Sequence, residues 1–157
     1  MSEFSIDIET NRVPERLSLL RGLFQRPTDA LDSVARTMRE RVLERFNTKT
    51  APSGRKWAKW APSTAAARIR PDAIHGTLLE RTGALKRSFV ARPEGTSSLR
   101  VGFSVSYAEF HEKGAPGMPA RPLLTVDRGT RLSKRDSVAV SLAVERAVSA
   151  ALARVLG

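Results

Sequence analysis

His111 stands between two glutamates, Glu109 and Glu112, directly before a Gly/Pro-rich segment in the stretch VSYAEFHEKGAPGMPARPLL (105–124). A histidine beside carboxylates can act as a general base or bind a metal. The spacing argues against both roles. Residues one or two apart diverge on a helix, whereas a catalytic pair or two ligands on one face needs steps of three or four. The stretch therefore predicts a structural corner or a loop for a partner.

Other residue types that could do chemistry are scarce. The second histidine, His75, follows Asp72 by three residues, but in a proline-containing segment that disfavours a helix. The chain has no phosphate-binding glycine loop and no Gly-x-Ser-x-Gly nucleophile turn. It also has no cysteine, which excludes disulfides and Cys-based metal sites and fits assembly in a reducing compartment. We therefore expect no catalytic site, no metal and no cofactor, and a protein that is not an enzyme.

A basic, tryptophan-containing loop is the second candidate site. No acidic residue occurs between positions 51 and 71, and the loop holds Trp57, Trp60, Arg55, Lys56, Lys59, Arg68 and Arg70. Indole rings stack on bases and basic side chains neutralise phosphates, so one interpretation is a DNA-binding module acting through residues 55–70. In the other interpretation, the tryptophans anchor an irregular loop to the core or to a neighbouring subunit. The absence of a recognised DNA-binding motif favours the anchor.

Length and charge bound the class of protein. A chain of 157 residues suits a single domain, and its net charge is +11. The charge is uneven, because residues 51–100 carry ten Lys/Arg against three Asp/Glu. Such a segment suits nucleic acid, an acidic protein surface or simply a solvated face. No apolar run approaches the roughly 18 residues that cross a bilayer, and MSEFSIDIET does not resemble a signal peptide. We expect a soluble protein made in a cytoplasm.

The elements that must position these residues are partly regular. Alternation of Phe4, Ile6 and Ile8 with polar residues predicts a half-buried strand, and Pro14 can begin a short helix. Apolar residues at steps of three and four predict a helix over about 28–46, with one buried face; they are Leu31, Val34, Ala35, Met38, Val42 and Phe46.

The second half of the chain predicts a hairpin and a long helix. Segments 87–92 and 98–104 are rich in β formers and flank a turn. YAEFHEK predicts one or two helical turns, and RPLLTV a short strand. Ser133 and Asp136 have the spacing of a capping box at the start of a helix over 133–156, with its first turns deeply buried. Segment 138–144 also suits a strand. The whole is one α+β domain over 1–157, a small sheet packed by two long helices, with a long loop at 47–82 and a partner loop at 113–122.

Several short motifs then occur in one order and resemble a known family. Together they are similar to the phage virion morphogenesis, or tail-completion, family of tailed bacteriophages, which includes the Mu-like G protein and the P2-like S protein. The matching residues cover roughly positions 44–124 and are Gly54 with Trp57, Thr82-Gly83-Ala84-Leu85, Val101-Gly102, Tyr107-Ala108 with His111, and Ala120-Arg121-Pro122. The chain departs from the pattern at Glu112, where family members often have glutamine.

The resemblance implies a structural virion protein of the neck or upper tail that acts as a ring, with six-fold symmetry the usual expectation. It would complete or terminate the tail and support head–tail joining, contacting neck and tail-tube proteins near viral DNA, with no membrane involved. Interface candidates are then Trp57, Trp60, Lys56, Lys59, Pro116, Met118 and Arg121. Tyr107, Phe110, His111, Thr82 and Gly83 would form a structural corner, in which Tyr107 and Phe110 are buried and His111 hydrogen-bonds to fix the loop.

Overall fold

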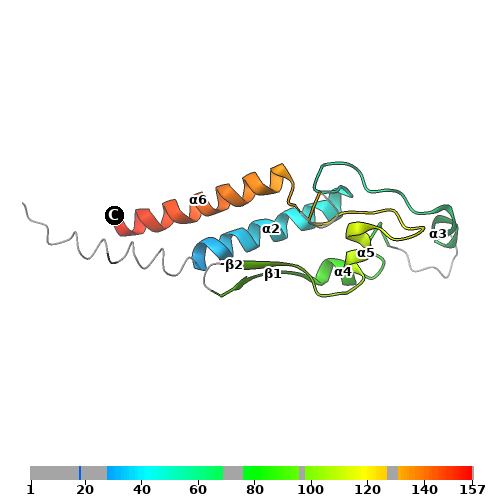
Figure 1. Ribbon diagram of the computed structural model, residues 1–157, viewed down its shortest axis with the longest axis horizontal. Coiled ribbons are helices and arrows are strands. Elements are labelled where there is room, and N and C mark those ends of the chain that lie inside the picture. Colours follow the sequence, from blue (N-terminus) through cyan, green and yellow to red (C-terminus); the bar gives the residue numbers. More distant parts are fainter. Residues whose placement is uncertain (1–17, 19–27, 69–75, 96–97, 127–130, 157) are drawn as a thin grey trace, which may run out of the picture.

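The computed structural model describes residues 18, 28–68, 76–95, 98–126 and 131–156. In chain order, its elements are α2 (Thr28–Thr48), α3 (Pro62–Ala67), α4 (Ala84–Arg87), β1 (Phe89–Glu94), β2 (Ser98–Phe103), α5 (Ala108–Lys113) and α6 (Lys134–Leu156). Figure 1 shows α2 in the middle, α6 along one side of it and the β1–β2 hairpin along the other. The predicted α+β class is confirmed. The strand expected at 4–8 and the helix expected after Pro14 lie outside the described residues.

Helix α2 is the central element and follows the apolar pattern of the sequence. Its buried face carries Val34, Met38, Val42 and Phe46 at steps of four, and the last two side chains are fully buried. One charged residue, Arg45, is buried with them. Because α2 packs against both α6 and the hairpin, its buried face contributes to the core on both sides.

The hairpin forms where it was predicted, with a shifted start. β1 and β2 are antiparallel, with Phe89 opposite Phe103 and Glu94 opposite Ser98. Residues 84–87, the last of which was assigned to the first arm, instead make the single turn α4 and bury Leu85. Phe89 is buried, and its ring meets that of Phe103 edge-on at 5.4 Å between centroids.

Helix α6 begins at the predicted capping box. The Ser133 hydroxyl accepts from the Asp136 backbone N–H at 3.0 Å and donates to the Asp136 carboxylate at 2.7 Å. Segment 138–144, which also suited a strand, is helical. The expectation of deeply buried first turns is wrong, because α6 packs mainly on α2 and leaves Val138 51% and Leu142 43% exposed.

The strand expected at RPLLTV does not form. Residues 121–126 have no strand pairing, although Leu123 is fully buried. The backbone N–H groups that a strand would pair are instead bound by a side chain. The Glu112 carboxylate accepts from the N–H groups of Leu123 and Thr125 at 2.7 Å each. A carboxylate that accepts several backbone donors substitutes for a neighbouring strand here.

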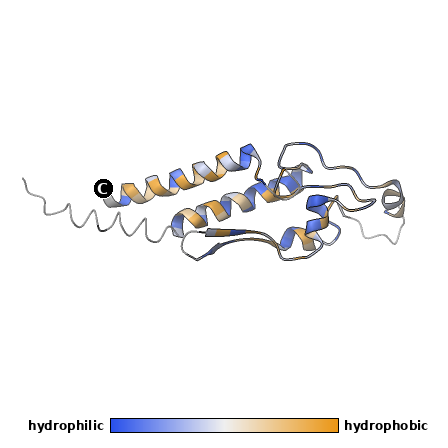
Figure 2. Ribbon diagram, viewed as in Figure 1, coloured by the Kyte–Doolittle hydropathy of each residue, from blue (hydrophilic) through white to orange (hydrophobic). Residues whose placement is uncertain are grey.

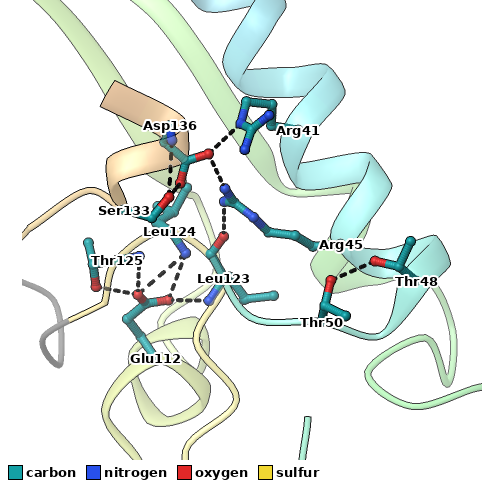
Figure 3. Close-up of polar contacts among 10 residues, drawn as sticks. All are labelled: Arg41, Arg45, Thr48, Thr50, Glu112, Leu123, Leu124, Thr125, Ser133 and Asp136. Atoms are coloured by element: carbon teal, nitrogen blue, oxygen red, sulfur yellow. Dashed lines mark hydrogen bonds and ion pairs between the residues drawn. The ribbon is translucent and has the colours of Figure 1, made fainter. Parts of the chain in front are cut away.

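One buried polar cluster joins α2, α6 and the segment around Leu123 (Figure 3). Asp136 is fully buried, and one of its oxygens accepts from both Arg41 Nε and Arg45 Nη2. A second Arg45 nitrogen, Nη1, donates to the Leu123 carbonyl at 2.6 Å. Burial lowers the pKa of the Arg45 guanidinium, and the attraction of Asp136 opposes this shift. We call Arg41, Arg45, Ser133 and Asp136 the Asp136 cluster.

Replacing Asp136 should therefore destabilise the fold strongly. Asp136→Asn keeps the size of the side chain but leaves the buried Arg45 without a counter-charge, and breaking a buried pair typically costs about 3 kcal/mol or more. We expect the urea midpoint of unfolding, followed by circular dichroism, to fall accordingly. The matched control is Asp29→Asn, since the Asp29–Arg154 pair is exposed and should contribute little. Equal midpoints for the two variants would contradict this role of the cluster.

Candidate assembly surface

Two irregular segments far apart in the sequence are joined into one arm. Residues 49–61 and 114–122 run side by side away from the helices toward α3 (Figure 1). The Trp57 indole N–H donates to the Pro122 carbonyl at 2.9 Å. In return, Arg121 donates from Nε to the Ala58 carbonyl and from Nη2 to the Lys59 carbonyl, both at 2.8 Å. These bonds link two segments that were predicted from the sequence as separate long loops. We call residues 49–61 and 114–122 the paired loops.

The two tryptophans of the basic loop have different environments. Trp57 is 5% exposed and meets Phe46 edge-on, with 5.7 Å between ring centroids. It therefore anchors the loop to the core of its own subunit and would serve an interface only by holding that loop. Trp60 is half-buried, and the Arg68 guanidinium lies over its ring at 4.4 Å.

The basic residues of this loop remain at the surface. Lys56 and Lys59 are exposed, and Lys56 Nζ donates to the Thr48 carbonyl at 2.7 Å. Arg55 is exposed as well, whereas Arg70 lies outside the described residues. Of the basic side chains in this loop, only that of Arg68 lies over an indole ring in the described structure.

The Gly/Pro-rich segment makes a tight turn at the far part of the paired loops. The backbone groups of Ala115 and Met118 bond to each other in both directions, at 3.0 and 2.8 Å. Gly117, at the third position of this turn, has φ +72°, and Pro116 precedes it, as in a type II turn. Gly114 also has positive φ, and a Cβ there would lie 3.1 Å from the Ala120 nitrogen. The turn leaves Pro116 exposed and Met118 half-buried.

The corner at α5 is fixed by Glu112 rather than by the His111 ring. The Glu112 carboxylate binds the backbone of 123–125, as described above, and the Thr125 hydroxyl donates to it as well. His111 contributes its backbone carbonyl, which accepts from the Arg121 N–H at 2.6 Å. Its ring atom Nδ1 is buried and has no hydrogen-bond partner among the described residues. Burial and then the charge of Arg121 lower the pKa of His111, which favours the neutral ring.

The expected burial of the α5 aromatics is wrong. Tyr107 is 41% exposed and Phe110 54% exposed, whereas the small residue between them, Ala108, is buried. Tyr107 contacts His111 edge-on at 6.1 Å between ring centroids. A helix of one or two turns packs on the core with one side only. In α5 this side carries Ala108, so the larger aromatic side chains stay exposed.

The Thr82-Gly83 motif starts α4, next to a second polar cluster. Gly83 has φ +72° at the N-cap, and the Thr82 hydroxyl accepts from the Ala84 N–H at 3.4 Å. Nearby, Glu80 pairs with Lys49 and Lys86. Although partial burial opposes it, hydrogen bonds from Lys49, Thr77 and Lys86 lower the pKa of Glu80 to about 2. The Glu80–Lys49 ion pair links the residue that follows α2 to the segment before α4.

The paired loops and the corner at α5 are the candidate assembly surface among the described residues. No group of three or more metal-ligating side chains occurs among them. In the same part of the chain, no helix is long and apolar enough to cross a membrane. The roles of Glu112 and Asp136 in fixing the chain were missed from sequence. The sequence signal for Glu112 was an acid at the end of a short predicted helix before a Gly/Pro-rich segment. The signal for Asp136 was an acid of a capping box at the start of a largely apolar helix.

A comparison of two neighbouring glutamates tests the corner. Glu112→Ala removes the acceptor of three backbone N–H groups and should lower the free energy of unfolding by about 2–4 kcal/mol, since donors are left unpaired. Protection of the amides at 123–125 should be lost in hydrogen exchange. Glu109→Ala, which removes only an exposed pair with Lys113, should leave both readouts unchanged. Retained protection in Glu112→Ala would refute the assignment.

Comparison with known proteins agrees with this picture. A search of curated proteins and one of solved structures each return no match. Residues 8–154 match the family model described as the phage virion morphogenesis family, a longer span than the motifs noted above. Since this match includes α2, the hairpin, the paired loops and nearly all of α6, the chain belongs to the phage virion morphogenesis family.

Proposed function

We propose that this protein is a structural component of the phage neck or upper tail. Several copies would form a ring that completes or terminates the tail and supports head–tail joining, with six-fold symmetry as the family resemblance implies. A structural role in virion building follows from the family. The observation that carries the ring is that one subunit has two exposed apolar patches on different elements.

The first patch runs along α6. Its four exposed apolar side chains are Val138, Leu142, Val144 and Val148. Figure 2 shows hydrophobic residues recurring along α6 on the side seen in that view. The buried side of α6 is carried by small residues, Ala143 and Ala151, which pack on α2. A helix that is apolar on more than one side is typical of an element with a second neighbour.

The second patch is formed by Tyr107 and Phe110 on α5. In Figure 1, α5 lies near α4 at the end of the hairpin, whereas α6 lies on the other side of α2. Two different patches favour a head-to-tail contact, in which the α6 patch of one copy meets the α5 patch of the next. Contacts of this kind close into rings, while a two-fold dimer uses one patch twice.

The paired loops would provide contacts beyond the ring. They extend away from the helices and expose Lys59, Pro116 and Pro119. Prolines reduce the entropy lost when a loop docks, and the internal bonds of Trp57 and Arg121 preorganise both segments. We propose that this arm binds neighbouring neck or tail-tube proteins.

Complementation between two variants tests the head-to-tail contact. Leu142→Asp disrupts the α6 patch, and Phe110→Asp disrupts the α5 patch. Each variant alone should lose its large assemblies, because a buried unpaired charge is costly at an interface. Mixed together, they should form heterodimers, since each still has the one patch the other needs. Native mass spectrometry measures the species directly.

A control variant and two alternative outcomes complete this test. Asn47→Asp changes an exposed residue at the end of α2 and should assemble as the parent does. If the parent is monomeric even when mixed with its tail partners, the ring is refuted. If the mixture of Leu142→Asp and Phe110→Asp stays monomeric while the parent assembles, the head-to-tail pairing of these two patches is refuted.

The DNA-binding alternative rests on Trp60, which stays half-buried beside Lys59 and Arg68. Under the ring proposal, Trp57→Ala should destabilise the subunit by about 3–5 kcal/mol, because it truncates a buried aromatic. Trp60→Ala should leave the fold intact and DNA affinity equal to that of the parent. A loss of about 1–3 kcal/mol in salt-sensitive DNA binding for Trp60→Ala would instead favour the DNA-binding module. Fluorescence anisotropy with labelled single-stranded DNA at two salt concentrations gives the comparison.

A further inference from the structure

A pocket of about 390 Å³ lies beside Trp60, and three arginines and a histidine line it. They are Arg68, Arg81, Arg121 and His111, and none of the described residues that line it is an aspartate or glutamate. Leucines of the segment 78–85 form the apolar part of the wall. We call this site the arginine pocket.

Arg121 gives the pocket a buried charge without a counter-charge. The residue is 6% exposed, and within the described residues its guanidinium donates to the backbone carbonyls of Ala58 and Lys59. No carboxylate of the described residues pairs with it. Burial lowers the pKa of its guanidinium, and no acid acts in the opposite direction. Buried cations are normally paired with an acid, so the site favours an anion.

The neighbouring polar groups are also available to a ligand. Arg81 is exposed and makes no hydrogen bond or ion pair with the described part of the chain. Arg68 binds the Gly76 carbonyl with Nη1 at 2.8 Å, which leaves the rest of its guanidinium to lie over Trp60. His111 Nδ1 has no described partner. Three positive charges and one unpaired ring nitrogen thus surround the same space.

An apolar hollow adjoins the arginine pocket. Its volume is about 500 Å³, and it shares Trp60 and Leu78 with the arginine pocket. Ala65 lines it, with Lys49 and Lys59. A ligand that lies across Trp60 therefore meets guanidinium groups on one side and apolar side chains on the other. An extended peptide with alternating acidic and apolar residues has this pattern, since successive side chains point in opposite directions.

We propose that the arginine pocket binds residues 3–9 of an adjoining copy of the chain. This segment reads EFSIDIE, with Glu3, Asp7 and Glu9 on one side of an extended chain and Phe4, Ile6 and Ile8 on the other. The first basic residue is Arg12, so the segment is purely acidic. Its charge is complementary to the arginines, and its apolar side suits the hollow beside Trp60.

The position of α2 favours an adjoining copy as the source. α2 begins at the end of the hairpin and helix pair remote from α4 and α5 (Figure 1), so the point at which the preceding chain joins α2 lies far from the pocket of the same subunit. A neighbour in an assembly can present the same segment directly. This inference rests on the proposed assembly of several copies, but its contact is separate from both apolar patches.

Cross-linking between copies tests the proposal, because the chain has no native cysteine. One protein carries Ser5→Cys and a second carries Thr64→Cys, an exposed position at the arginine pocket. Mixed, assembled and treated with a short bis-maleimide linker, they should give a cross-linked dimer on a denaturing gel, with the joined peptides identified by mass spectrometry. Replacing Thr64→Cys by Ser98→Cys, an exposed position on the hairpin, should give little product.

Charge reversal gives the decisive comparison. Arg81→Glu in the Thr64→Cys protein should reduce the yield about fivefold, since it removes one attraction and adds one repulsion. Adding only Asp7→Arg to the Ser5→Cys protein should restore part of the yield, because the new arginine can pair with the new glutamate while Glu3 and Glu9 still face Arg68 and Arg121. Arg92→Glu, on the hairpin, should change nothing.

Two results would overturn the proposal. One is a yield insensitive to Arg81→Glu. The other is a cross-link within a single chain. In that case, a protein that carries both Ser5→Cys and Thr64→Cys gives an intramolecular product, and the mixture of the two single-cysteine proteins gives no dimer. If the Leu142→Asp and Phe110→Asp mixture still forms heterodimers while this cross-link fails, the ring proposal stands and only the docking of residues 3–9 is refuted.

Discussion

The fully buried carboxylate of Asp136 is the interaction on which the rest of this subunit depends. It contacts Ser133 at the start of α6 and pairs with two arginines of α2, one of which also donates to the Leu123 carbonyl. A buried charge pair adds little stability compared with apolar packing, but each partner becomes costly when alone. The cluster thus favours one arrangement of α2, α6 and the segment around Leu123. Apolar contacts alone would fix this arrangement less specifically, because the buried residues of α6 that face α2 are mainly alanines.

From this cluster, a continuous series of contacts leads to the surface. Leu123 is held by Arg45 from one side and by the Glu112 carboxylate from the other. The residues just before it, Arg121 and Pro122, bind the loop that carries Trp57. The two segments of the paired loops are therefore held together by side chains and not by a strand ladder, because Trp57 and Arg121 donate to backbone carbonyls of the facing segment. The motifs Gly-x-x-Trp and Ala-Arg-Pro, which are distant in the sequence, are two halves of one contact.

The sequence was sufficient for the elements whose signal is local. The steps of three and four in α2, the Ser133–Asp136 cap and the hairpin turn each depend on residues close together in the chain. It was insufficient where the outcome depends on a distant partner. Nothing local to Tyr107 or Phe110 says that no element of the subunit covers them, and nothing local to RPLLTV says that Glu112 will take its N–H groups. The apolar character of segment 138–144 all round the helix was interpreted as burial within the subunit, but Val138 and Leu142 are exposed in the described structure.

The subunit has a modest core for its size, and this bears on its function. A two-stranded sheet and one long helix pack on the two sides of α2, and within the described residues α6 keeps four large apolar side chains exposed. The isolated subunit exposes several large apolar side chains. It also buries the Arg121 guanidinium without a carboxylate partner among the described residues. Both features leave favourable interactions unmade. Within an assembly, neighbouring subunits can cover the exposed apolar side chains and supply a carboxylate to the buried arginine. A protein whose family builds virions has such neighbours at high local concentration, so features that would be liabilities in a monomer support the proposal that this chain works as part of a larger structure.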